Sequence, residues 1–190
     1  MDATRIAVKL FAADSAPVDR DAAIVVFHKW IQQKALDEMF IDVVDYRHVQ
    51  DGPGVLLVAH AANYTLDRLG GRDGLTYFFK GRDTSSELTT IEDRLRAALA
   101  RLFVAALKLE ADLGLRFRGE ELLVQLNDRL LAPNTAETLE AIAAPLRAVC
   151  ERLYAGAPVT HNHLADHSRP FAVEIVSAQP IDVATLASRI

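Results

Sequence analysis

The sequence predicts an α+β protein with a mainly antiparallel sheet, helices on one face of the sheet, and two βαββ halves joined by a long central helix. Three observations carry this prediction. Short apolar segments alternate with turn residues, a long apolar pattern of helical period runs through the middle, and both ends follow the same order of elements. At 190 residues, the chain fits a single domain, residues 1–190.

The first half, together with the strand that follows it, combines strand and helix patterns. Its first strand contains apolar residues and one lysine, and its helix carries Phe27 and Trp30, which we expect to be core anchors. The turn sequence Asp51-Gly52-Pro53-Gly54 predicts a hairpin between the second and third strands. In order, the expected elements are a strand at 6–11, a loop at 14–19, a helix at 20–36, and strands at 40–48, 55–62 and 75–80.

The central helix has the strongest pattern. Thr89 and Glu92 fit a capping box at its start, and Gly114 supplies a stop. Two neighbouring apolar stripes run along it, which predicts that it is covered by the sheet and also by another helix or a second subunit. The stripes contain Ile91, Leu95, Ala98, Leu102, Ala105 and Leu109, and beside them Leu99, Phe103 and Ala106.

The second half repeats the plan of the first. A helix is predicted to open at Asn134, with Glu137 three residues later, and to end at Gly156, with Pro145 inside it as a kink or break. The other expected elements are a strand at 122–126, a hairpin of strands at 157–164 and 171–178, and a short helix within 181–190.

The two halves superimpose as patterns when 116 is added to the numbers of residues 6–60. Val8 then falls on Val124 and Pro17 on Pro133. The pattern is explained either by an ancestral duplication or by two uses of a common βαββ module. The repeated halves are 5–62 and 121–178, with a connecting strand and helix at 75–113. Paired about a twofold axis, they would resemble a pair of ferredoxin-like units.

The charge pattern and composition argue against several functions. The net charge of −5 comes from interleaved acids and bases, so no clustered basic face for nucleic acid is expected. The strongest apolar run, 55–59, is much shorter than the ~20 residues of a membrane span. Cys150 is the single cysteine and is expected to be a small core residue. With no signal-peptide pattern at the start, a cytoplasmic location is expected.

Three histidines form the most suggestive polar cluster. His161 and His163 are two residues apart on a predicted strand and would share a face, while His167 could fold back across the turn. Three imidazoles suit zinc, and imidazole also suits iron, so the cluster predicts a possible zinc or iron site. The alternative is that these histidines are simply solvated beside a polar turn.

Asp45 and His60 are the candidate catalytic residues. In a hairpin centred on the Gly-Pro-Gly turn, Asp45 would lie diagonally across from His60, and an Asp–His pair can form a general base. The simpler interpretation is a core histidine with one hydrogen-bond partner. The Asp51–Gly54 turn could also form a backbone nest for phosphate, although turn formation alone explains it.

Two functions follow from these observations. The first is a binding or assembly protein that forms a homo-oligomer and binds no nucleic acid or membrane, with a small-molecule ligand possible. Its basis is the lack of a complete catalytic motif together with the broad apolar helix. The alternative is a metal- or haem-dependent enzyme that uses His161, His163 and His167. The sequence leaves open whether the protein is an enzyme.

Overall fold

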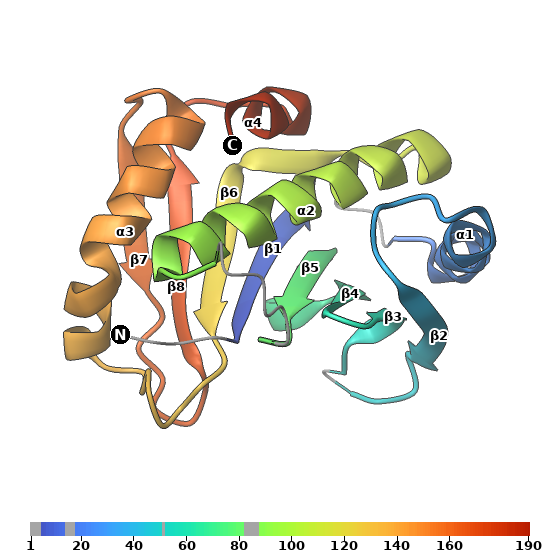
Figure 1. Cartoon of the computed structure of the whole chain (residues 1–190), viewed down its shortest axis with the longest axis horizontal. Coiled ribbons are helices and arrows are strands. Elements are labelled where there is room, and N and C mark those ends of the chain that lie inside the picture. Colours follow the sequence, from blue (N-terminus) through green and yellow to red (C-terminus); the bar gives the residue numbers. More distant parts are fainter. Residues whose placement is uncertain (1–4, 14–17, 51, 82–87) are drawn as a thin grey trace.

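The computed structural model describes residues 5–13, 18–50, 52–81 and 88–190 (Figure 1). Within these ranges the chain forms one eight-stranded sheet, four α-helices and the short 3-10 helix η1 (Leu69–Gly71). The strand order is β2-β3-β4-β5-β1-β6-β8-β7, and every pairing of neighbouring strands is antiparallel. The strands are β1 (Ile6–Ala12), β2 (Phe40–Tyr46), β3 (Gly54–Ala59), β4 (Ala62–Asp67), β5 (Gly74–Phe79), β6 (Phe117–Leu126), β7 (Val159–His163) and β8 (Phe171–Ser177). Most of the loop predicted at 14–19 lies outside the described residues.

The helices cover one face of this sheet. They are α1 (Arg20–Gln33), α2 (Ile91–Leu113), α3 (Ala136–Tyr154) and α4 (Val183–Arg189). In Figure 1, α2 crosses the strands obliquely, with α3 over the β7–β8 side and α1 beside β2. Alternate residues of the strands join the buried helix residues in one apolar core, which includes Val8, Leu57, Val124 and Phe27. The opposite face of the strands has no α-helix against it in the described chain, and only η1 packs there through Leu69.

Capping residues explain where the helices begin and end. At two helices, α2 and α3, the capping residue is the one after the residue that the sequence predicted. The side chain of Thr90 caps α2 and forms a capping box with Asp93, one residue later than the predicted Thr89–Glu92 pair. Gly114 ends α2 in the left-handed conformation, as predicted. Thr135, not Asn134, caps α3, and Pro145 lies inside a helix that continues on both sides of it.

The broad apolar arc of α2 is covered within the chain. Both predicted stripes are buried, except for Ile91, which is half-buried at the start of the helix. The helix contacts β1 and β5 below it and α1, α3 and α4 around it. Phe27, Trp30 and Cys150 are also buried, as predicted. The width of the arc therefore needs no second subunit as its explanation.

The predicted third strand is wrong beyond Ala59. The chain bends at His60 and Ala61 and returns as β4, which pairs with β3 and β5 and was expected to be loop. This two-residue reversal contains no glycine, proline, asparagine or aspartate, the residues that usually mark such turns. The apolar pattern therefore runs across the turn without a visible break.

No helix of the described residues is both long and apolar enough to span a membrane.

Gly54 and Gly114 provide a matched pair for testing the backbone. Both have positive φ, at 65° and 66°, but a Cβ at Gly54 would overlap the carbonyl oxygen of Leu66, whereas one at Gly114 meets nothing within 4 Å. We expect Gly114→Ala to reduce the free energy of unfolding by about 1 kcal/mol, the usual left-handed penalty. Gly54→Ala should cost at least about 2 kcal/mol more, because strand β4 must move away. Urea denaturation measures both, and equal losses would contradict the close approach of β3 and β4.

Candidate functional site

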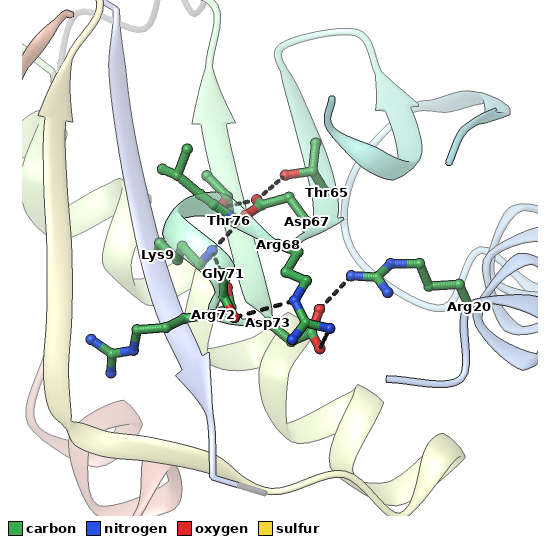
Figure 2. A network of polar contacts seen from close by, with 10 residues as sticks. Lys9, Arg20, Thr65, Asp67, Arg68, Gly71, Arg72, Asp73 and Thr76 are labelled. Atoms are coloured by element: carbon green, nitrogen blue, oxygen red, sulfur yellow. Dashed lines mark hydrogen bonds and ion pairs between the residues drawn. The ribbon is translucent and has the colours of Figure 1, made fainter. Parts of the chain in front are cut away.

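A buried ion pair lies on the face of the sheet that no α-helix of the described chain covers. Lys9 of β1 is 1% exposed, and its Nζ donates to Oδ1 of Asp67 at 2.5 Å and to the carbonyl oxygen of Arg72 at 3.0 Å. Figure 2 shows Lys9 beneath the turn 68–73, which connects β4 to β5. Burial lowers the pKa of Lys9, and the attraction of Asp67 opposes that change.

The Asp67 carboxylate has partners for both oxygens. Oδ1 accepts from Lys9 and from the backbone N–H of Leu69 at 3.1 Å. Oδ2 accepts from the hydroxyls of Thr65 at 2.8 Å and Thr76 at 2.6 Å. Taking a carboxylate and an ammonium out of water costs several kcal/mol per ion, and good geometry with further hydrogen bonds offsets that cost. These bonds hold β1, β4 and β5 to one another and to the turn.

The turn 68–73 separates two hollows in the protein surface. Gly70 and Gly71 have φ values of 64° and 77°, which lets the chain turn tightly above Lys9. Leu69, Gly70 and Arg72 line a hollow on one side, while Arg68 and Gly71 line another. The ion pair beneath the turn therefore fixes a wall that the two hollows share.

The first hollow, which we call the open-face pocket, has a volume of about 330 Å³ and an apolar floor. Phe11 of β1, Leu123 of β6 and Ala172 of β8 are each about 5% exposed and form a small cluster of their own, with Leu69 packed against it. Small-molecule sites are typically concave, about 300–1,000 Å³ in volume, and apolar with a few polar groups. The open-face pocket has that size and character.

Charged groups surround this floor. The guanidinium carbon of Arg72 lies 3.7 Å from the centre of the Phe11 ring, and Arg72 forms ion pairs with Glu121 and, at 3.1 Å, with Glu174. On the opposite wall, Arg169 pairs with Asp166 at 3.4 Å. The rim thus offers both signs of charge around an apolar base, and it suits a ligand with an apolar body and a polar end.

Asn134 fixes the second wall of the pocket, the loop 164–170. Its buried amide nitrogen lies 2.9 Å from the carbonyl oxygens of Leu164 and Asp166 and 3.3 Å from that of Pro170, and it serves as their donor. Its side-chain oxygen is 2.6 Å from Nε2 of His163. Asn134 was expected to cap a helix, but it anchors the loop because Thr135 takes the capping position.

The three candidate metal ligands lie on β7 and in the loop that follows it. His161 and His163 lie on β7 and share a face, as predicted for residues two apart, but His163 is bonded to Asn134 and packs 5.1 Å from the Phe171 ring. His161 and His167 are exposed, and partial burial lowers the pKa of His161. No group of three or more His, Cys, Asp or Glu side chains among the described residues is arranged to hold a metal ion. The zinc or iron site stays a prediction.

Asp45 and His60 lie at opposite ends of the β2–β3 hairpin. Asp45 faces Val55, whereas His60 follows Ala59 at the other end, where its N–H donates to the carbonyl of Met39. The hairpin register predicted for this pair is therefore wrong. The Asp45 carboxylate is bonded to Arg47 instead, at 2.9 and 3.0 Å from Nε. The general base was inferred from that register, so the register no longer supports it, and a catalytic role for either residue stays a prediction.

The residues of the buried network were not predicted as a site. One signal was visible: Lys9 interrupts an otherwise apolar strand, and a buried lysine needs an acidic partner. Its partner could not be identified, because Asp67 is 58 residues away and lies at the end of the strand that the pattern missed.

Comparison with known proteins does not assign this chain to a family. A scan against protein-family models gives no match, and a search of curated proteins gives no significant match.

Removing one partner of the Lys9–Asp67 pair should lower the stability of the protein strongly. Lys9→Met leaves a buried carboxylate without its cation, and we expect the free energy of unfolding to fall by about 3–5 kcal/mol. The matched control is Lys108→Met, which removes a half-exposed i,i+4 pair with Asp112 and should cost less than about 1 kcal/mol. Urea denaturation of both variants, of Asp67→Asn and of Lys9→Met/Asp67→Asn tests the coupling of Lys9 to Asp67. If the double variant loses as much free energy of unfolding as Lys9→Met and Asp67→Asn lose together, the two groups are not coupled.

Proposed function

We propose that this protein is a binding protein and that a small, mainly apolar ligand with a polar end binds in the open-face pocket. The supporting observation is the separate apolar cluster of Phe11, Leu123 and Ala172 on the sheet face that has no α-helix in the described chain. An antiparallel sheet with one solvated face usually places polar residues there. Three neighbouring strands, β1, β6 and β8, depart from that pattern at the floor of this pocket.

The charge pairing around the pocket favours binding over catalysis. Arg72 is paired with two glutamates and Arg169 with Asp166, so the rim groups are held in place by one another. Paired groups of this kind orient a ligand through the hydrogen-bond donors and acceptors that they still present. The two walls, the turn 68–73 and the loop 164–170, are anchored by Lys9–Asp67 and by Asn134 respectively. A pocket with fixed walls binds without a large ordering cost.

We further propose that the halves 5–62 and 121–178 are two βαββ units related by a pseudo-twofold axis, resembling ferredoxin-like units. The β1–β6 register supports this proposal. Val8 pairs with Val124, its equivalent 116 residues later, and the pairs Ala7–Gln125 and Lys9–Leu123 exchange under the same shift. The helices α1 and α3 begin at Arg20 and Ala136, which are also 116 residues apart. In this arrangement the β4–β5 hairpin, with its turn 68–73, is an insertion that supplies the pocket wall.

Self-association is the remaining part of the proposal, and edge strand β2 supports it. Ile41 on this strand is 59% exposed, and Met39, the residue just before the strand begins, is 71% exposed. An edge strand presents unpaired backbone groups, so a second copy could pair along β2 and cover both side chains.

Filling the pocket tests the proposed ligand site. Ala172→Leu places a larger side chain on the floor, and Val176→Leu is its control on the same face of β8 but outside the pocket. We expect the apolar anionic probe 8-anilinonaphthalene-1-sulfonate to bind Ala172→Leu at least about tenfold more weakly than the wild type, and Val176→Leu within about twofold. Fluorescence titration gives these affinities. Equal probe affinity in folded Ala172→Leu would contradict the site.

Sedimentation velocity tests self-association. The wild type is expected to be a dimer, and Ile41→Lys to be a monomer, because a lysine on the paired edge opposes pairing. The control is Val104→Lys, on the outer side of α2, where the side chain is 53% exposed. A monomeric wild type, or a dimer that survives Ile41→Lys, would contradict pairing through β2.

A further inference from the structure

A second hollow lies on the other side of the turn 68–73 and is lined by arginines. This arginine cavity has a volume of about 460 Å³. The charged side chains among its described lining residues are all arginines: Arg20 of α1, Arg47 after β2, and Arg68 of the turn. The rest of the described lining consists of Tyr46, Val49, Gln50, Gly52, Gly54 and Gly71.

Aspartates hold these arginines without lining the cavity themselves. Asp73, whose side chain is 7% exposed, pairs with Arg20 and lies 3.8 Å from Arg68. Figure 2 shows Arg20 and Arg68 converging on this carboxylate. Asp45 holds Arg47 through Nε and, at 2.7 Å, through Nη2, and hydrogen bonds from Arg47 lower the pKa of Asp45 to about 2. The guanidinium groups are therefore positioned in advance.

Arg20 and Arg68 retain hydrogen-bond donors for a ligand, whereas Arg47 already donates from all three nitrogens to Asp45 and Asp21. A guanidinium carries five N–H groups. Within the described chain, Arg20 has one hydrogen bond, to Asp73, and Arg68 has one, from Nε to the carbonyl of Gly71. Arg20 is also the first residue of α1, where the helix dipole favours an anion. Gly52, Gly54 and Gly71 add no side chains to the lining, so part of the wall is backbone.

We propose that the arginine cavity binds a phosphoryl group, either free phosphate or the phosphate of a small phosphorylated molecule. Three guanidinium groups from three separate parts of the chain surround one space, and guanidinium groups match the geometry and charge of phosphate oxygens. The cavity has room for a phosphate and for an organic part attached to it. This site is separate from the open-face pocket, so each binds its ligand whether or not the other proposal holds.

Calorimetric titration of the full chain tests this site. The probes are sodium phosphate and phenyl phosphate, at constant ionic strength in chloride. We expect saturable binding at one site, weakened about tenfold by Arg68→Gln and by Arg47→Gln, a factor that corresponds to about 1.4 kcal/mol. Arg68 is 53% exposed, so its replacement should not prevent folding, and thermal unfolding monitors this for both variants. The control is Arg152→Gln on α3, an exposed arginine outside the cavity that should bind phosphate within about twofold of the wild type.

The outcomes distinguish a site for free phosphate, a site for a phosphorylated molecule and no specific site. Binding of phosphate but not of phenyl phosphate supports a site for the free ion, and binding of both supports a site for a phosphorylated molecule. The absence of saturable binding, or an equal loss in Arg152→Gln, would overturn the proposal because the arginines would then act only as diffuse surface charge. Binding that persists unchanged in folded Arg68→Gln and Arg47→Gln would also overturn it.

Discussion

The ion pair between Lys9 and Asp67 is the interaction on which the uncovered face of the sheet depends. It joins the central strand β1 to β4 and, through the Arg72 carbonyl, to the turn above. An ion buried on one side of a sheet is stable only with a complete set of partners. Thr65, Thr76 and the Leu69 N–H complete that set for Asp67. The same bonds that compensate for burial also fix the wall between the two hollows.

The two faces of the sheet use different physical means of stabilisation. On the helix side, one continuous apolar core joins all four helices to the strands. On the other side, a small apolar cluster and a polar network lie next to each other, connected by Arg72, which packs on Phe11 and pairs with Glu121 and Glu174. The first arrangement tolerates small shifts, because dispersion and burial have little directional preference. The second depends on directed hydrogen bonds, so it specifies the positions of its side chains more tightly.

Sequence patterns predicted most elements but not the site. The reason is that helices and hairpins have local signals in the sequence, whereas the site depends on contacts between residues far apart in the chain. Helices α2 and α3 and the β7–β8 hairpin have local periodicity, caps and turn residues, and these were visible. The reversal at His60–Ala61 has no such signal, so β4 was missed and Asp67 was placed in a loop. Pairing Lys9 with Asp67 requires the strand order, which depends on contacts distant along the chain. The role of Asn134 likewise follows from where the loop 164–170 returns, and not from its neighbours in sequence.

The position of β1 also has a consequence for how the chain is made. One edge of β1 pairs with β5, but its other edge pairs with β6, and the last residue of that register is Leu126. At synthesis rates of about 5–20 residues per second, an early apolar strand thus waits on the order of 10 s on the ribosome for its second neighbour. Long-range pairing of this kind slows folding and leaves an edge open to other chains. A lysine in the middle of such a strand opposes aggregation while the strand waits, and it becomes the buried cation of the finished sheet only after Asp67 has arrived.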